Sequence, residues 1–277
     1  MQTRTLAIET AANGQLIADN LSAHLHTHAN FYSSVLDNRR TVLVLVPSGY
    51  ETDTARRYPV LYLHDGQNLF DGATAYVPGQ YWRVGETAAE LMAAGAIEPL
   101  LIVGVYHMGE RRVDEYTPTC DPRVRQGGRA ALYGRMLLEE LQPFIDAHYR
   151  TRAGVEHTGL GGSSLGGLVS LFLGLRHPAA FGKLAALSPS VFWDGRMILR
   201  EVAALPAKPP TRIWLDTGTG EGWYTTEYAR MLRDALIGRG WALGHELNYL
   251  EAEGAGHDEA AWAARVAPML KFLFPPV

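Results

Sequence analysis

The chain has 277 residues, of which 47% are hydrophobic and 19% are charged. These proportions are typical of a globular protein, and the length is sufficient for one α/β domain with a large buried core. The formal net charge is only −4, and the sequence contains no basic block and no acidic tail. Composition therefore gives little support for nucleic acid or an anionic membrane surface as a partner.

Cysteine content and the first residues bear on the compartment. Cys120 is the one cysteine, so an internal disulfide is excluded, as is common in a reducing compartment. Its turn-like setting, with Pro122 following, argues against a nucleophilic thiol. The N-terminus lacks an apolar run with a cleavage site, and no apolar stretch approaches the roughly 18 residues that span a bilayer. We therefore expect a cytoplasmic protein without a membrane span.

Residues 1–35 have the least regular pattern, and we interpret them as an irregular N-terminal extension or an edge strand. His24, His26 and His28 alternate within it, which would put three imidazoles on one strand face. A metal site is conceivable there, but alternating polar residues are more typical of a half-exposed strand. We predict no metal site at these histidines.

From residue 40 onward, short apolar runs alternate with segments of helical periodicity. This alternation predicts right-handed crossovers and a mostly parallel sheet with helices on both faces, in a single domain over residues 1–277. Active groups then collect at the carboxyl ends of the strands. The predicted strands are 41–46, 59–63, 100–106, 183–187, 211–216 and 246–250; the predicted helices include segments 84–92, 133–144, 168–175, 228–235 and 262–273.

The sharpest local motif lies in residues 161–167, where Gly162-x-Ser164-x-Gly166 matches the nucleophile elbow. Such an elbow needs a strand before it, for which residues 156–160 are a weak candidate, and a helix after it. Glycines two residues to either side remove side chains that would collide with the strained turn. The alternative is a glycine-rich turn in which Ser164 only caps a helix, and Ser163 fits the motif less well.

A general base is expected on a loop after the last strand, because hydrolases of this type order their triad as serine, acid, histidine. His257 follows the predicted strand 246–250 and precedes the last helix, whereas His177 and His245 do not lie on loop tips. The acid is expected after the strand 211–216. Glu221, on a glycine-rich loop, is preferred over Asp216 at the strand end.

Two backbone amides are expected to stabilise an oxyanion. One is the amide of Leu165, directly after the proposed nucleophile, and the other lies in the loop after the strand 59–63. Gly66 allows a tight turn there, so we predict that Gln67 provides the second amide, with Asn68 as the alternative. A plain Asp-Gly turn remains the other interpretation of this loop.

Besides Glu221 and Asp216, Asp194 is a third candidate for the acid, but it is more typical of a turn residue.

These segments together resemble the putative-esterase family of α/β-hydrolases, which includes enterochelin, feruloyl and acetyl-xylan esterases and the antigen 85-type mycolyltransferases. The resemblance covers most of the chain, from about residue 40 to the C-terminus. The matching stretches are 58–70, with the sequence YPVLYLHDGQNLF, then 161–167, 187–190, 215–221 and 256–257. It implies an α/β-hydrolase fold, a triad of Ser164, Glu221 and His257, and an oxyanion amide from Gln67.

The resemblance implies a serine esterase that works through an acyl-enzyme on a small-molecule ester, without metal or cofactor. Trp82, Trp193 and Trp223 lie near strand ends or catalytic loops and could bind an aromatic acyl group, although large aromatics more often fill a core. A non-catalytic binding protein of the same fold, and a serine peptidase or acyltransferase with the same triad, are the alternatives. The sequence leaves the substrate and the oligomeric state open.

Overall fold

A nine-stranded sheet is the centre of the part of the chain that the computed structural model describes, residues 2–5 and 24–277. The strand order is β1-β2-β3-β5-β4-β8-β9-β10-β11. Pairings from β5 to β11 are parallel, whereas β1, β2 and β3 pair antiparallel with their neighbours. The strands are β1 (Gln2–Thr5), β2 (His24–Ser33), β3 (Asn38–Val46), β4 (Val60–His64), β5 (Leu101–Val105), β8 (Thr158–Ser163), β9 (Lys183–Leu187), β10 (Arg212–Gly218) and β11 (Leu247–Ala252).

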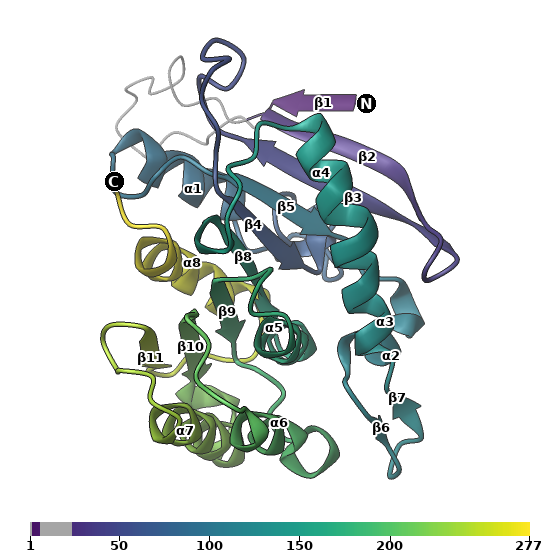
Figure 1. Cartoon of the computed structure of the whole chain (residues 1–277), viewed down its shortest axis with the longest axis vertical. Coiled ribbons are helices and arrows are strands. Elements are labelled where there is room, and N and C mark those ends of the chain that lie inside the picture. Colours follow the sequence, from purple (N-terminus) through teal and green to yellow (C-terminus); the bar gives the residue numbers. More distant parts are fainter. Residues whose placement is uncertain (1, 6–23) are drawn as a thin grey trace.

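Helices cover both faces of this sheet (Figure 1). A hydrophobic cluster lies on each face of the sheet. Helices α1 and α8 pack on one face, and the helices from α3 to α7 pack on the other. The helices are α1 (Val84–Ala93), α2 (Arg112–Tyr116), α3 (Ala130–Arg135), α4 (Gln142–His148), α5 (Leu165–Arg176), α6 (Trp193–Ala204), α7 (Trp223–Gly238) and α8 (Glu259–Leu273). The predicted α/β fold with a mostly parallel sheet is confirmed, while the single-domain organisation stays a prediction.

Strand β4 illustrates why the sheet is buried on both sides. Its side chains alternate between the clusters: Val60 and Tyr62 face the α3–α7 side, and Leu61 and Leu63 face the α1–α8 side. All four are almost completely buried. A continuous apolar run is what a parallel strand with two covered faces requires, and this run leads directly to the loop that begins at His64.

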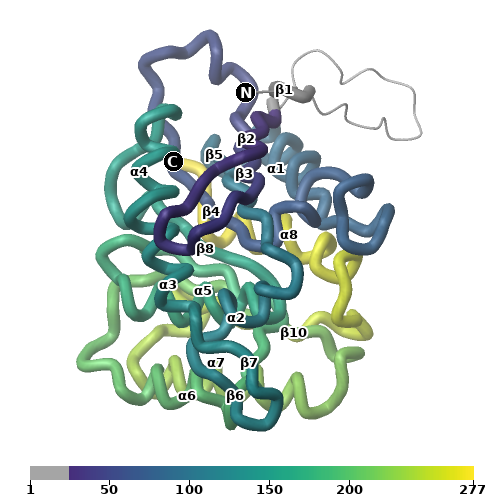
Figure 2. The backbone as a smooth tube through the Cα atoms, turned by 90° about the vertical axis from the view of Figure 1, so that its right-hand side faces the viewer, coloured from purple at the N-terminus to yellow at the C-terminus, as the bar shows by residue number. Residues whose placement is uncertain are grey.

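Two predicted elements differ from the structure. Residues 24–33 are not an irregular extension but a ten-residue strand, β2, that lies inside the sheet between β1 and β3. The strand before the elbow begins at Thr158, because Val155–His157 form a 3-10 turn. Residues 6–23 of the N-terminal segment lie outside the described residues, as does the side chain of His24. In the turned view of Figure 2, β2 and β3 run side by side.

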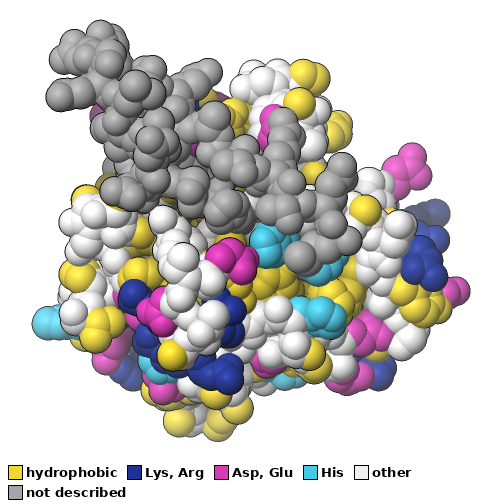
Figure 3. Space-filling model, turned by 90° about the horizontal axis from the view of Figure 1, so that it is seen from above, with side chains coloured by type: hydrophobic (Ala, Val, Ile, Leu, Met, Phe, Trp, Pro, Cys, Tyr) yellow, Lys and Arg dark blue, Asp and Glu magenta, His cyan; other side chains and the backbone are white. Residues whose placement is uncertain are grey.

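Two histidines of β2 have partners on α4 and at its end. The rings of His26 and His28 both hydrogen-bond to the hydroxyl of Tyr149, at 3.2 and 2.8 Å. His28 also packs edge-on against Phe144. Figure 3 shows histidine side chains beside hydrophobic ones on the face seen from above. These contacts account for His26 and His28 as a strand face packed against a helix.

Candidate active site

The loop between β8 and α5 forms a strained elbow at Ser164. Ser164 adopts φ 55° and ψ −121°, a backbone conformation that costs about 1–3 kcal/mol for a residue other than glycine. The strand ends at Ser163 and the helix begins at Leu165, so the Ser164 side chain projects from a sharp turn. A Cβ at Gly162 would lie 3.0 Å from the carbonyl carbon of Gly166, which explains why the sequence has glycine there.

The loop after β9 holds this elbow in place. The amide of Ser164 donates to the carbonyl of Leu187 at 3.0 Å, and the amide of Ser190 donates to the carbonyl of Ser164 at 3.0 Å. The hydroxyl oxygens of Ser164 and Ser190 lie 3.2 Å apart. Ser164 is half-buried, whereas Ser190 is buried. The elbow is therefore anchored on both sides by residues 187–190.

The loops after β10 and β11 bring His257 and Glu221 together. Nδ1 of His257 lies 2.7 Å from Oε2 of Glu221. The Glu221 side chain is 1% exposed and that of His257 is 39% exposed, so the imidazole is accessible and its carboxylate partner is not. Burial raises the pKa of Glu221, but hydrogen bonds from His257, Ser188 and the amide of Gly218 outweigh it, and the net pKa lies below the ordinary value. Glu221 is therefore an anion that fixes the tautomer of His257.

Tryptophan side chains support the imidazole from the α8 side. The ring of Trp262 meets that of His257 edge-on, with centroids 5.0 Å apart and an interplanar angle of 81°. Trp82 packs in turn on Trp262, with centroids 5.8 Å apart. Both tryptophans are buried. Trp82 thus lies behind the histidine, in the hydrophobic cluster beneath α1 and α8.

The loop after β4 carries the second predicted oxyanion amide. Gln67 lies in the 3-10 turn Gly66–Asn68, and the preceding Asp65 adopts a left-handed conformation with φ 56° and ψ 46°. Arg112 holds Asp65 through a two-pronged ion pair of 2.7 and 2.8 Å. Burial opposes ionisation of Asp65, but Arg112 lowers its pKa below the ordinary value. In the described chain, neither the Gln67 amide nor the Leu165 amide donates a hydrogen bond to another protein group.

The alternative acids of the sequence analysis lie elsewhere. Asp216 is fully buried and binds Arg265 at 2.8 Å, Trp214 at 2.7 Å and the amide of Ser188 at 3.0 Å. Asp194 lies in α6 and pairs with Arg200. Of the three carboxylates considered, the structure brings Glu221 to His257.

The three predicted substrate-binding tryptophans differ strongly in exposure. Trp82 and Trp193 are 1% and 6% exposed, and the indole of Trp193 donates to the carbonyl of Thr119. Trp223 is 82% exposed and begins α7, two residues after Glu221. A buried indole offers little surface to a ligand, so Trp223 is the member of this set with a ring open to substrate.

Sequence reasoning did not assign a role in the site to Ser188 or Ser190, and it did not predict the ion pair between Arg112 and Asp65. Ser188 and Ser190 lie in the Leu-Ser-Pro-Ser segment after β9, and its position at a strand carboxyl end was the available signal. Arg112 comes from the segment after β5, a second strand end on the same edge. Their contacts depend on how distant loops meet, which local patterns do not specify.

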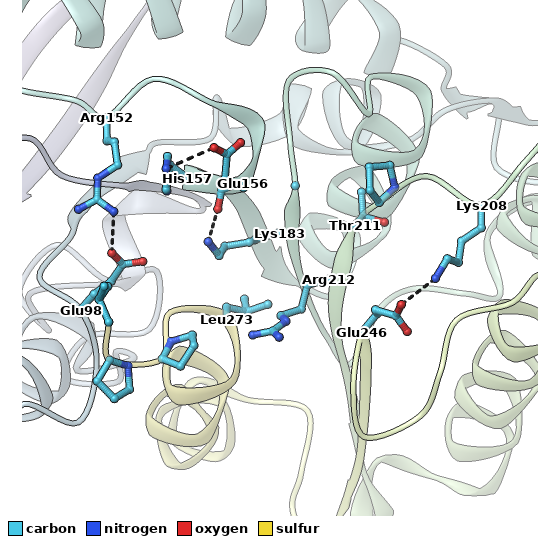
Figure 4. Close-up of a pocket in the computed structure, with 15 residues that line it drawn as sticks. Glu98, Arg152, Glu156, His157, Lys183, Lys208, Thr211, Arg212, Glu246 and Leu273 are labelled. Carbon is cyan, nitrogen blue, oxygen red and sulfur yellow. Dashed lines mark hydrogen bonds and ion pairs between the residues drawn. The ribbon is translucent and has the colours of Figure 1, made fainter.

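A separate cavity of about 710 Å³ lies at the opposite end of the sheet, where β9 and β10 begin (Figure 4). Its charged lining is largely paired: Arg152 binds Glu98 at 3.1 Å and Lys208 binds Glu246 at 2.8 Å. None of the predicted catalytic residues lines it. The candidate active site is therefore the carboxyl-end edge and not this cavity.

Comparison with known proteins identifies the family of this chain. The family described as "Putative esterase" matches residues 33–273. The uncharacterized protein YbbA of Bacillus subtilis is 31% identical over 67% of this chain and 70% of its own length. The ferri-bacillibactin esterase BesA of the same species is 30% identical over 63% of this chain and 62% of its own. The endo-1,4-beta-xylanase/feruloyl esterase of Xylanibacter ruminicola is 27% identical over 88% of this chain and 30% of its own length.

Two solved structures show that other proteins have the same fold. The BES protein of Bacillus cereus superposes with a TM-score of 0.72 at 22% identity, covering 96% of this chain and 98% of its own. The enterobactin esterase FES of Shigella flexneri gives 0.70 at 21% identity, over 91% and 59%. Within the described residues, no helix has the length and apolar character needed to cross a membrane. The family match and the esterase among the curated relatives, BesA, support carboxylic-ester hydrolase activity, and the chain belongs to the putative-esterase family of α/β-hydrolases.

Proposed function

We propose that this chain is a serine esterase that hydrolyses small or aromatic acyl esters through a covalent acyl-enzyme. Ser164 is the nucleophile, His257 the general base and Glu221 the acid. The observation that carries the proposal is the 2.7 Å contact between His257 and the buried carboxylate of Glu221, next to a strained serine elbow. Such a pair makes a histidine a competent base for a serine hydroxyl.

The tautomer of His257 determines the direction of proton transfer. Glu221 is ionised and accepts a hydrogen bond from Nδ1–H of His257, so Nε2 keeps the lone pair that a general base needs. The Ser164 hydroxyl, which contacts Ser190 in the resting state, turns toward Nε2 when the ester enters. Catalytic hydrogen bonds commonly form only in the substrate complex.

The reaction then proceeds in two steps, acylation of Ser164 and hydrolysis of the acyl-enzyme. Oγ of Ser164 bonds to the carbonyl carbon while its proton moves to Nε2 of His257, and collapse of the tetrahedral adduct expels the alcohol, which takes that proton. Water repeats the sequence on the acyl-enzyme: its proton moves to His257 and then to Oγ of Ser164, which leaves as the carboxylic acid departs.

The oxyanion of each tetrahedral adduct is stabilised by the amides of Leu165 and Gln67. Neither amide has another acceptor in the described chain, and Leu165 begins α5, whose positive dipole end adds to the stabilisation. Loss of one such donor costs about 100- to 1000-fold in kcat in enzymes of this kind. The Arg112–Asp65 ion pair keeps the Gln67 turn in its strained form.

The acyl group is small or aromatic. Trp223 presents an 82% exposed ring two residues from Glu221 and can stack on an aromatic acyl group. The curated relatives that support this class are a feruloyl esterase and a ferri-bacillibactin esterase, of which this chain matches only part of the length. Trp223→Ala should lower kcat/KM for a feruloyl ester several-fold more than for the corresponding acetate.

Labelling by a fluorophosphonate probe, combined with turnover of p-nitrophenyl acetate, tests the proposal. The wild-type protein should be labelled and active, and Ser164→Ala should lose both properties. His257→Ala and Glu221→Gln should lose most turnover. Ser163→Ala, which removes the neighbouring buried hydroxyl, is the matched control and should keep activity.

Other outcomes identify the rival functions. Absence of labelling in the wild-type protein would indicate a binding protein of the same fold. Faster turnover of peptide p-nitroanilides than of esters would indicate a peptidase. Full activity of the Ser164→Ala variant would show that Ser164 is not the nucleophile.

A further inference from the structure

The hydroxyl of Ser188 lies at the centre of a buried polar cluster behind Glu221. Its oxygen is 3.1 Å from Nε1 of Trp262 and 3.3 Å from an Nη atom of Arg265, and it hydrogen-bonds to Oε1 of Glu221. Ser188 is fully buried and adopts a positive φ of 43°. The surrounding structure must hold Ser188 in this unfavourable backbone conformation.

The identity of the neighbours dictates where the Ser188 proton points. A hydroxyl donates one hydrogen bond and accepts two. Indole and guanidinium N–H groups only donate, so Trp262 and Arg265 occupy both acceptor positions of Ser188. The single Ser188 proton is therefore directed to Glu221.

As a result, the two carboxylate oxygens of Glu221 have different hydrogen-bond partners. Oε1 accepts hydrogen bonds from the Ser188 hydroxyl and, at 2.7 Å, from the amide of Gly218. Arg265 lies 3.9 Å from the same oxygen. Oε2 is left to face His257 at 2.7 Å. A carboxylate held in this way cannot rotate to present its other oxygen.

We propose that Ser188 and Arg265 are positioning residues for the triad acid: they orient Glu221 so that Oε2 holds His257. The inference rests on the proposed function, since it assigns a role through Glu221. Neither residue touches the substrate or the reacting atoms. Their effect reaches the chemistry through the carboxylate alone.

Asp216 completes the arrangement from β10. One of its oxygens accepts from Arg265 at 2.8 Å and from the amide of Ser188 at 3.0 Å, which fixes both positioning residues at once. Arg265, with a 3% exposed side chain, is thus a single cation between the carboxylates of Asp216 and Glu221. The charged and titratable groups facing Glu221 are therefore His257, Arg265 and Asp216.

Ser188→Ala removes the hydroxyl while keeping the volume of the backbone and Cβ. We expect kcat on p-nitrophenyl acetate to fall about 10- to 100-fold with KM nearly unchanged, as for other groups that orient a catalytic ligand. The acid limb of the kcat/KM profile should move to higher pH. A Glu221 carboxylate that loses a hydrogen-bond donor becomes more basic, so it stabilises the protonated form of His257 more strongly. A purely structural role would move neither the pH limb nor kcat at fixed KM.

Further variants separate positioning from folding. Ser188→Gly relieves the positive φ and also lacks the hydroxyl, so it should fold securely and show the same kinetic defect. Arg265→Met paired with Asp216→Asn removes both buried charges together and should reproduce the shifted pH limb. Ser170→Ala, a buried hydroxyl bound to the carbonyl of Gly166 within α5, is the control and should change neither parameter.

The results distinguish failure of the inference from failure of the proposed function. Wild-type kcat and pH limb in Ser188→Ala and Ser188→Gly, with a severe defect in Glu221→Gln, would overturn the positioning role and leave the triad intact. Wild-type activity in Glu221→Gln would overturn the acid assignment and, with it, the positioning role. A folded Ser188→Gly with low kcat and a shifted limb supports the inference.

Discussion

The hydroxyl oxygens of Ser164 and Ser190 lie 3.2 Å apart, so the proposed nucleophile is hydrogen-bonded to a second serine in this structure. Within the described residues, Ser164 makes no hydrogen bond to His257. Ser190 is 3% exposed, and its amide also donates to the carbonyl of Ser164. The proposed attack by Ser164 therefore requires its hydroxyl to turn away from Ser190.

Removing the Ser190 hydroxyl should release Ser164 for His257. A neutral hydrogen bond contributes a net of about 0.5–1.5 kcal/mol, which corresponds to about a 2- to 10-fold effect on rate. We expect Ser190→Ala to react about 2- to 10-fold faster with a fluorophosphonate probe. Quenching the labelling reaction at successive times, followed by mass spectrometry of the intact protein, measures this rate.

Ser163→Ala is the control for this experiment, because Ser163 neighbours Ser164 and is buried, but within the described residues its hydroxyl makes no hydrogen bond to Ser164 or Ser190. Its labelling rate should equal that of the wild type. A Ser190→Ala variant that is labelled more than tenfold slower would show that Ser190 assists the reaction instead of competing for the nucleophile.

The sequence motifs predicted Ser164, Glu221 and His257 because each follows a strand in a fixed chain order, and the Glu221–His257 contact agrees with that order. The strand before the elbow was weakly predicted because Gly159, Gly161 and Gly162 carry no side chains that could give an apolar pattern. Glycine is needed at Gly161, where a Cβ would lie 2.6 Å from that of Ala185 on β9. That reason is visible only once the strands are paired.

The support behind the site was beyond prediction for a different reason. Ser188 and Glu221 are 33 residues apart, and Asp216 and Arg265 are 49 apart. Their contacts depend on the register of β9, β10 and α8, which no local pattern encodes. Residues 24–33 were hard to assign because two of their polar side chains, His26 and His28, pack against Tyr149 at the end of α4.

The Arg112–Asp65 ion pair should control the rate through the loop of residues 65–68, which carries Gln67 and is called the oxyanion loop below. Arg112→Met leaves the left-handed turn at Asp65 without its partner, and the Gln67 amide loses its fixed position. We expect kcat on p-nitrophenyl acetate to fall about 10- to 100-fold, with a smaller change in KM, because the amide acts on the transition state. Steady-state kinetics on both esters and thioesters measures the effect.

Arg111→Met is the matched control, since Arg111 is the neighbouring arginine and is exposed. It should retain the wild-type kcat. An Arg112→Met variant with unchanged kcat and raised KM would instead indicate that Arg112 binds the substrate.

The buried Asp216 should make stability depend on pH. Burial raises the pKa of Asp216 to about 6, against the opposing effect of Arg265 and of hydrogen bonds from Trp214 and Ser188. The folded state therefore binds a proton more tightly than the unfolded state, and the free energy of unfolding falls as pH rises from about 4 to about 6. We expect this fall to amount to about 2–3 kcal/mol from Asp216 alone.

Urea unfolding followed by tryptophan fluorescence at several pH values tests this expectation. Asp216→Asn cannot ionise, so the difference in unfolding free energy between the wild type and this variant should change across that pH window. The window comes from the ordinary carboxyl pKa of 3.8 at the lower end and the raised value at the upper end. A difference that stays constant from pH 4 to pH 7 would show that Arg265 keeps Asp216 ionised throughout.

Gly66 should tolerate no side chain, because the oxyanion loop passes directly against β5. A Cβ at Gly66 would lie 2.6 Å from the carbonyl carbon of Gly104 and 2.8 Å from the amide nitrogen of Val105, both backbone atoms that cannot move aside alone. Gly66→Ala must therefore displace the turn that carries Gln67. We expect kcat to fall about 100-fold or more, and the free energy of unfolding to fall by about 1–3 kcal/mol.

Gly238→Ala provides the contrast, because a Cβ there meets nothing within 4 Å at the end of α7. It should keep full activity and gain up to about 1 kcal/mol of stability from the better helix propensity of alanine. Kinetics and urea unfolding of the two variants side by side separate a local steric effect from a general intolerance of glycine replacement. A Gly66→Ala protein that is destabilised yet retains wild-type kcat would mean that the Gln67 amide does not stabilise the oxyanion, and a donor would have to be sought elsewhere on the same edge of the sheet.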